Sequence, residues 1–251
     1  MVQIFCEQTD RNGDNDLRLS GENFHHVIQV LRLRAGDELS VRFAGETAEY
    51  RYVLERIEAD TALCRLRCVR EADVELPCHI TVLQGLPKAD KMETVIQKTI
   101  ELGAAEIVPV ACERSVVRLD DKKKESRRER WQRIAEAAAK QSHRAVIPRV
   151  QAPCSFAEAL VSCGDADVRL IPWELAGEQG ASMEETRAIV NGIRPGQRVC
   201  VLIGPEGGFT GDEVQKAQDA GFLPITLGRR ILRTETAAMT VLSWLVLTLD
   251  Q

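Results

Sequence analysis

The feature that most constrains this sequence is a regular alternation of short apolar runs and longer amphipathic segments after residue 78. The short runs are strand-like, and the longer segments repeat apolar residues at helical spacing. The expected strands are 79–84, 106–110, 168–173, 199–203 and 223–227. The expected helices are 91–102, 124–140, 156–161, 183–191, 212–220 and 235–249. This alternation predicts an α/β fold, with a mostly parallel sheet and helices on both of its faces.

The first part of the chain has a different pattern, which is rich in strands. Strand-like segments cover 39–43, 49–57 and 63–69. One helix is expected over 22–31. We therefore predict two domains, a small β-barrel over 1–72 and the α/β domain over 73–251. A change in composition near the Leu76-Pro77 step favours a boundary in this part of the chain.

Composition excludes several classes of protein. Hydrophobic residues make up 44% and charged residues 28% of the chain, which rules out an intrinsically disordered protein. The longest apolar run, Met239 to Leu249, is about half of the roughly 20 residues that cross a bilayer. The N-terminus lacks the basic and then apolar segments of a signal peptide. We therefore expect a cytoplasmic protein that does not contact a membrane.

The cysteines and histidines do not form a metal-binding pattern. No two of the eight cysteines have CxxC spacing, and Cys64 and Cys68, which are four apart, have no matching pair after them at zinc-site spacing. We therefore expect small buried side chains in a reducing compartment. His25 and His26 are adjacent, and adjacent side chains on a helix point apart. His79 and His143 are isolated in the sequence. We expect no metal ion.

One basic stretch stands out in an acidic protein. Residues 88–149 hold 15 basic and 10 acidic side chains, whereas the whole chain has a formal net charge of −5. Its densest part is the segment 122–133. This pattern is explained either by a solvated helix face or by a surface that contacts phosphates, because polyanion binding needs only local positive charge. Both explanations stay open at this point.

The most informative stretch is 199–213. A strand-like run ends in Gly204-Pro205-Glu206-Gly207-Gly208, and Thr210 with Glu213 forms a capping-box pattern for the following helix. Ligands of parallel sheets bind at the carboxyl ends of strands, where glycines let backbone amides approach them. The stretch matches neither the P-loop nor the dinucleotide pattern. A tight turn alone would also explain glycines, but two glycines and a Glu206 that looks buried exceed what a turn requires.

Two further stretches follow strand-like runs. In the segment 227–237, three arginines stand beside Ile231 and Leu232. Arginines bind anions while the two apolar residues favour burial, a combination common at ligand sites. A helix-cap loop with snorkelling arginines is the alternative. Leu170-Ile-Pro-Trp-Glu174 ends another strand, and we expect the three loops to converge at one edge of the sheet.

These motifs carry a resemblance to a known family. Ile203-Gly-Pro-Glu-Gly-Gly-Phe209, followed by Leu227-Gly-Arg-Arg-Ile-Leu-Arg-Thr-Glu-Thr-Ala237, resembles the RsmE family of bacterial ribosomal RNA methyltransferases, within the SPOUT superfamily. Lys88-Ala-Asp-Lys-Met-Glu93 and Glu113-Arg-Ser115 are also typical of that family. Lys140 stands where a glutamate is more usual.

The resemblance implies a PUA-like β-barrel that binds RNA, followed by a SPOUT α/β domain whose C-terminal part forms a trefoil knot. It implies S-adenosylmethionine as the cofactor and methyl transfer to N3 of a specific uridine in 16S ribosomal RNA. The small-subunit ribosomal RNA and a second copy of the chain, in a homodimer, are the expected partners.

The resemblance also implies roles for individual residues. Cofactor contacts are expected at Pro172, Leu202, Ile203, Gly204, Gly207, Gly208, Leu227, Gly228, Ile231 and Leu232. Backbone groups would bind the adenine and ribose, so no acidic ribose-binding residue is expected. Arg233 is the expected catalytic cation, and Glu206 or Glu235 the expected base. RNA contacts are expected at His26, Arg32, Lys88, Lys91, Lys98, Arg114 and Arg144.

Two other functions fit parts of this pattern. A non-catalytic RNA-binding protein of ribosome assembly would keep the barrel and the basic stretch, but it would not need both the glycine and the arginine loops. A SPOUT methyltransferase that acts on transfer RNA, for example on a ribose hydroxyl, is the third possibility, and only the resemblance of the loop 227–237 argues against it. The intact loops favour an enzyme over a binding protein.

Overall fold

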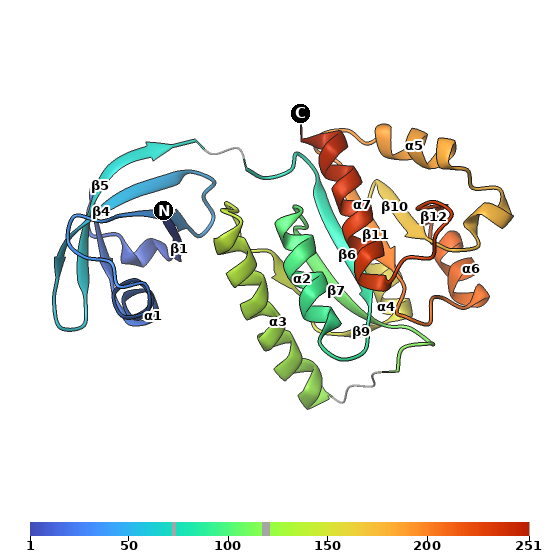
Figure 1. Ribbon diagram of the computed structural model, residues 1–251, viewed down its shortest axis with the longest axis horizontal. Helices are drawn as coiled ribbons and strands as arrows, with labels where there is room; N and C mark the ends of the chain where they lie inside the picture. Colours follow the sequence, from blue (N-terminus) through green and yellow to red (C-terminus); the bar gives the residue numbers. More distant parts are fainter. Residues whose placement is uncertain (72–73, 117–120, 251) are drawn as a thin grey trace. The chain divides into compact units, whose positions relative to one another are not determined.

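The computed structural model describes residues 1–71, 74–116 and 121–250 (Figure 1). The chain forms two compact units, one of Met1–Glu75 with Ala139–Ile147 and one of Leu76–Ala138 with Pro148–Gln251. The predicted boundary between residues 72 and 73 lies outside the described residues and stays a prediction.

The first unit is built on a five-stranded sheet in the order β1-β3-β4-β5-β2. Its strands are β1 (Val2–Cys6), β2 (Asp16–Leu19), β3 (Glu38–Phe43), β4 (Glu49–Ile57) and β5 (Ala62–Arg70). The pair β1–β3 is parallel and the other pairs are antiparallel. A short helical turn η1 (Gln8–Asp10) follows β1, and the predicted helix consists of α1 (Gly21–Phe24) and the π-helical η2 (His25–Val30). Alternate strand residues, such as Leu17 and Leu19, fill one apolar core.

A buried ion pair holds the second segment of this unit in place. Arg144 is only 3% exposed, and its Nη2 lies 2.5 Å from Oε2 of Glu75. The amide of Ala145 donates to the same carboxylate at 2.8 Å, and Nε2 of Gln3 donates to the carbonyl of Arg144 at 2.8 Å. The expected RNA contact of Arg144 does not fit this structure, because its guanidinium is buried and already paired.

The second unit contains a parallel sheet in the order β12-β10-β11-β6-β7-β8, with β9 also pairing with β7. Its strands are β6 (His79–Gly85), β7 (Glu106–Ala111), β8 (Arg149–Val150), β9 (Cys154–Ser155), β10 (Val168–Pro172), β11 (Arg198–Ile203) and β12 (Leu223–Ile225). All recorded pairs in this sheet are parallel, which confirms the α/β prediction.

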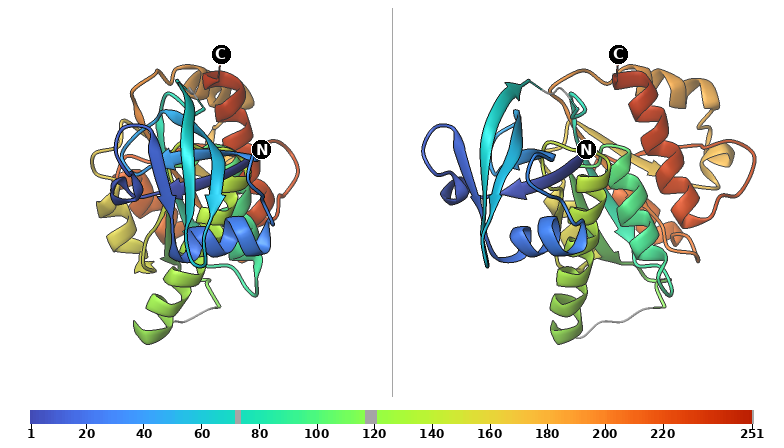
Figure 2. Two further views of the ribbon diagram at one scale, coloured as in Figure 1. Left: turned by 90° about the vertical axis from the view of Figure 1, so that its left-hand side faces the viewer. Right: turned by 60° about the vertical axis from the view of Figure 1, so that its left-hand side comes forward.

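Helices cover both faces of this sheet. The helices of this part of the chain are α2 (Lys91–Glu101), α3 (Asp121–Gln141), α4 (Phe156–Ser162), η3 (Ala176–Gln179), α5 (Met183–Asn191), α6 (Gly211–Asp219) and α7 (Thr234–Leu249). Helices α2, α5 and α7 contribute to one core and α4 and α6 to the other. Figures 1 and 2 show α2 and α7 side by side on one face. Successive side chains of β11 therefore point into different cores. Val201 and Ile203 lie in the core with α2, α5 and α7, and Cys200 and Leu202 lie in the core with α4 and α6.

Among the described residues of this unit, three helices begin with a capping box. Thr210 and Glu213 form the predicted box at the start of α6, and Ser155 and Ser182 cap α4 and α5 in the same way. Asp90 precedes α2, but its side chain makes no cap hydrogen bond, because its backbone (φ −91°, ψ 10°) lacks the extended conformation of a capping residue.

The cysteines differ in part from the expectation. Cys163 and Cys200 form a disulfide between the end of α4 and β11, so these two are not separate thiols. Cys6, Cys64 and Cys112 are buried free thiols, as expected. Burial raises the pKa of Cys6 and of Cys64 to about 12, which keeps them protonated.

The helices of the described segments fall short of a membrane span. No helix there has both the length and the apolarity that crossing a bilayer requires.

Candidate active site

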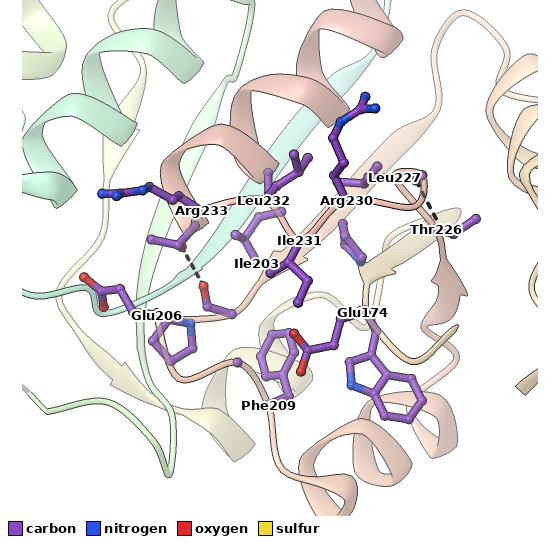
Figure 3. Close-up of a pocket in the computed structure, with 18 of the residues that line it drawn as sticks. Glu174, Ile203, Glu206, Phe209, Thr226, Leu227, Arg230, Ile231, Leu232 and Arg233 are labelled. Atoms are coloured by element: carbon purple, nitrogen blue, oxygen red, sulfur yellow. Dashed lines mark hydrogen bonds between the residues drawn. The ribbon is translucent and has the colours of Figure 1, made fainter. Parts of the chain in front are cut away.

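A cavity of about 410 Å³ opens at the carboxyl ends of β10, β11 and β12 in the second unit (Figure 3). Residues from three segments line it, 172–174, 203–209 and 226–237, together with Lys91 of α2. The three loops named from sequence thus converge, as predicted. They do so because their strands are parallel neighbours, and such strands end at the same edge of a sheet.

Most of the expected cofactor residues line this cavity. They are Pro172, Ile203, Gly204, Gly208, Leu227, Gly228, Ile231 and Leu232. Leu202 does not line the cavity, because its side chain points into the core that contains α4 and α6. Gly207 does not line it either, and it faces Arg114 instead.

The first cavity loop, residues 204–209, is held by buried polar contacts at its start. The hydroxyl of Thr234 donates to the carbonyl of Gly204 at 2.6 Å, and Nε2 of Gln84 donates to that hydroxyl at 2.8 Å. Gly85 permits this arrangement, because a Cβ there would lie 2.6 Å from Cδ of Pro205. None of Gln84, Gly85 and Thr234 was assigned to the site from sequence. The sequence signal that could have identified them was a glutamine and a glycine at the end of an apolar strand.

Glu206 anchors the middle of the same loop. Its carboxylate accepts from the backbone amide of Lys88 at 3.1 and 3.2 Å and lies 2.9 Å from Nζ of Lys91. Burial alone would raise the pKa of Glu206, but the hydrogen bonds from Lys91 and from backbone amides outweigh it and lower the pKa below its ordinary value. The side chain is 26% exposed, less buried than the sequence suggested. A firmly paired carboxylate of lowered pKa is a weak base.

Glu235 lies on the other side of Lys91. Its Oε2 is 3.9 Å from Nζ of Lys91, and this oxygen is buried with no hydrogen-bond partner. Glu235 does not line the cavity, whereas Glu206 and Arg233 do. Lys91 therefore stands between the two carboxylates that were the expected bases.

The far end of the loop is fixed by the segment that follows β7. Nη1 of Arg114 donates to the carbonyl of Gly207 at 3.0 Å, and a Cβ on Gly207 would lie 3.0 Å from Cβ of Arg114. The amide of Glu113 donates to the buried carboxylate of Glu213 at 2.8 Å. Gly207 is therefore a glycine because Arg114 packs against it, and the expected close approach of a ligand does not explain it.

The second cavity loop, residues 227–233, has few such contacts. Gly228 has a φ of +105°, which favours glycine. Ile231 is 84% exposed. Arg229, Arg230 and Arg233 all line the cavity, and in the described part of the chain none of their guanidinium groups has a hydrogen bond or ion pair. This loop offers an apolar side chain and three cations to whatever enters the cavity.

The other residues expected to bind RNA do not line this cavity. Lys98 is on α2 and pairs with Glu101 at 2.8 Å, while Lys88 lends its backbone amide to Glu206. His26 and Arg32 belong to the first unit. Burial, and then the charge of Lys140, lower the pKa of His26, which favours the neutral imidazole. Their RNA contacts stay predictions.

No donor set for a metal ion is found where the structure describes the chain. Across residues 1–71, 74–116 and 121–250, no three His, Cys, Asp or Glu side chains are grouped so that they could hold one.

Comparisons with known proteins agree with this geometry. Residues 74–246 match the RNA methyltransferase domain family, and residues 19–67 match the RNA methyltransferase PUA domain family. Ribosomal RNA small subunit methyltransferase E of Bacillus subtilis is 38% identical over 245 residues, which cover 97% of this chain and 95% of that protein.

Solved structures give the same result. Ribosomal RNA small subunit methyltransferase E of Neisseria gonorrhoeae, bound to S-adenosylmethionine, has a TM-score of 0.83 at 29% identity, covering 98% of this chain and 97% of that one. A methyltransferase of Legionella pneumophila, in complex with the same cofactor, has a TM-score of 0.82 at 32% identity, with the same coverage. With its PUA-like first unit and SPOUT-type second unit, the chain belongs to the RsmE family, the ribosomal RNA small subunit methyltransferases E.

Proposed function

We propose that this protein transfers the methyl group of S-adenosylmethionine to N3 of a specific uridine in 16S ribosomal RNA, in the cytoplasm and as a homodimer. Membership of the family makes it an S-adenosylmethionine-dependent methyltransferase of small-subunit ribosomal RNA. The proposal goes beyond this in four respects: the methylated position on the base, the homodimer, the cellular location and the knotted threading of the C-terminal part.

The single observation that supports this function most is the cavity at the three strand ends. Its volume suits a nucleoside with a short tail, and its walls combine apolar side chains with a few charged groups. The exposed Ile231 and the glycines Gly204 and Gly228 leave room for a flat base beside backbone groups. The residues present therefore fit S-adenosylmethionine.

The chemistry divides between cofactor and protein. S-Adenosylmethionine supplies a methyl group on a sulfonium that leaves as a neutral thioether. Uridine N3 has to lose its proton before its lone pair can attack, and negative charge then builds on the neighbouring ring oxygens. Arg233 lines the cavity without a protein partner among the described residues, and we assign it the stabilisation of that charge.

The two carboxylates near Lys91 take different roles in this proposal. Glu206 holds the loop 204–209, because its oxygens are engaged by Lys88 and Lys91 and its lowered pKa weakens it as a base. Glu235 keeps one oxygen without a hydrogen bond, but this oxygen is buried and does not line the cavity, so we propose that a water molecule carries the N3 proton to it.

Helix α7 supports the homodimer. Glu235 is its only charged residue, although it is an outer helix of the unit. Leu247 on this helix is 78% exposed. An outward apolar face of this kind favours contact with another protein surface. We expect Leu247→Glu to yield monomers in analytical ultracentrifugation, while Val161→Glu on α4, where Val161 is 79% exposed, leaves the dimer intact. A dimer that survives Leu247→Glu contradicts this interface.

The reaction is tested with labelled S-adenosylmethionine and small ribosomal subunits from a strain that lacks the modification. The expected product is one labelled uridine in 16S ribosomal RNA, identified by mass spectrometry as 3-methyluridine. Label in transfer RNA, or on a ribose hydroxyl, would point to another SPOUT specificity. Binding of subunits without any label would support the non-catalytic assembly protein instead.

A further inference from the structure

Glu174 is a carboxylate on the wall of the cavity, at the end of the stretch 170–174, and no role was assigned to it from the sequence. It comes two residues after β10, where the backbone is fixed on both sides. The amide of Trp173 donates to the carbonyl of Ile225 at 3.1 Å, and the amide of Ala176 donates to the carbonyl of Trp173 at 3.2 Å. The position of Glu174 is thus set by the sheet and by the turn that begins η3.

Within the described residues, the Glu174 side chain has no hydrogen bond or ion pair. Its nearest loop leaves it open: a Cβ on Gly208 would lie 3.8 Å from Oε1 of Glu174, and Gly208 has no side chain to fill that space. The Gly208 amide cannot reach it as a donor, because that amide already donates to the carbonyl of Pro205 at 2.9 Å. Among the described residues, the other carboxylate on the cavity wall is Glu206, and it is engaged by Lys88 and Lys91.

The surroundings of Glu174 are largely apolar. Figure 3 shows its carboxylate directed toward the cavity, near the ring of Phe209 and the side chain of Ile231. A ligand that fills this space takes water away from the carboxylate, and a carboxylate without water is costly unless the ligand brings donors. The ligand group at this point must therefore carry hydrogen-bond donors next to an apolar face.

The charges elsewhere in the cavity orient the ligand. Arg229 and Arg230 of the loop 227–233 attract the carboxylate of an amino-acid tail, and the guanidinium group of Arg230 projects away from Glu174 in Figure 3. The amino-acid end of the cofactor is thereby drawn away from Glu174. Among the remaining parts of the cofactor, the vicinal hydroxyls of the ribose offer two donors at the spacing of two carboxylate oxygens.

We propose that Glu174 binds the ribose diol of the adenosyl group and that this contact sets the specificity of the pocket for the sugar. This proposal rests on the proposed function and refines it, since the ribose was expected to be bound by backbone groups alone. Glu174 would then select ribonucleosides over deoxynucleosides.

The test is a calorimetric titration of the full-length protein with four probes: S-adenosylhomocysteine, its 2′-deoxy and 3′-deoxy analogues, and 5′-methylthioadenosine, which has the ribose but no amino-acid tail. Glu174→Ala should weaken binding of S-adenosylhomocysteine and of 5′-methylthioadenosine by about tenfold or more, the loss expected for a charge-assisted hydrogen bond. The variant should bind the deoxy analogues about as well as S-adenosylhomocysteine, whereas the wild type should discriminate against them.

A control variant and the pattern of affinities distinguish a failure of this proposal from a failure of the proposed function. Glu184→Gln removes a negative charge from an exposed position on α5 and should leave all four affinities unchanged. Unchanged binding of S-adenosylhomocysteine by Glu174→Ala would overturn the role of Glu174. A loss for S-adenosylhomocysteine without a loss for 5′-methylthioadenosine would overturn it as well, and would make Glu174 a partner of the ammonium group. A wild-type protein that binds none of the probes would contradict the function itself, together with this proposal.

Discussion

The two loops on either side of the cavity differ in how the protein holds them. The loop 204–209 is tied by polar contacts at its start, middle and end, through Thr234, Lys91 and Arg114. The loop 227–233 has three arginines with no side-chain partner in the described part of the chain and an almost fully exposed Ile231. The first loop is a scaffold that sets the shape of the cavity, and the second presents groups that a ligand completes.

This difference assigns different consequences to substitutions in the two loops. A change in the scaffold loop should alter cofactor affinity, because it moves a wall of the cavity. A change in the loop 227–233 should alter turnover, or the strength of one contact with the ligand, while the cavity keeps its shape. Four substitutions test that division, in decreasing order of expected effect.

Gly204→Val should abolish measurable cofactor binding, with a loss of at least about 100-fold in affinity. A Cβ at residue 204 would lie 3.2 Å from the ring of Phe209, so a β-branched side chain displaces that ring or occupies the cavity. Calorimetry with S-adenosylmethionine measures the loss. Gly211→Val is the matched control, because a Cβ there meets nothing within 4 Å. Equal affinities for the two variants would show that the cavity does not hold the cofactor.

Arg233→Ala should lower kcat by about 100-fold and change cofactor affinity by less than about threefold, because its role is proposed in the transition state. Single-turnover methylation of small ribosomal subunits, with a parallel titration of cofactor, separates the two quantities. Arg233→Lys keeps the charge and should recover part of kcat. If affinity falls and turnover at saturation does not, Arg233 serves binding only.

Arg114→Ala should weaken cofactor binding by about three- to tenfold, the value of one partly exposed hydrogen bond to the Gly207 carbonyl. The same residue was expected to contact RNA, and the two roles give different readouts. A scaffold role lowers affinity for S-adenosylhomocysteine in the absence of RNA. An unchanged cofactor affinity with weaker binding of ribosomal subunits would make Arg114 an RNA contact instead.

Glu206→Gln should produce the smallest effect, below about 1 kcal/mol in the free energy of unfolding. The pKa of Glu206 is lowered in the folded protein, so its stabilising contribution is present above its unfolded value of about 4.5 and is lost as pH falls through the folded value. The stability difference between wild type and variant should therefore shrink from about pH 6 to about pH 3 in urea titrations. A difference that grows over this range contradicts the anchoring role.

Much of the fold followed from local sequence patterns. The strands β6, β7, β10 and β11 and the helices α2 and α4–α7 lie where apolar periodicity placed them, because each buries one face or one stripe against a shared core. The strands β8 and β9 were missed. Each has two residues, too few to show any alternation, and each is defined by its pairing with β7.

The site was predicted in outline, and the contacts between distant residues were not. The convergence of the loops followed from strand direction. The partner of Gly207 is Arg114, and the partner of Arg144 is Glu75, and these pairs are 93 and 69 residues apart. Likewise, the missing cap at Asp90 depends on a backbone angle that residue type does not fix. Such contacts depend on tertiary structure, which local patterns do not encode.

A crystal structure of the protein grown with S-adenosylhomocysteine would test the central claim most directly. The account predicts the nucleoside inside the cavity, between the loops 204–209 and 227–233, with Ile231 covered and the ribose hydroxyls at Glu174. A nucleoside bound elsewhere on the chain, with this cavity filled only by solvent, would contradict it.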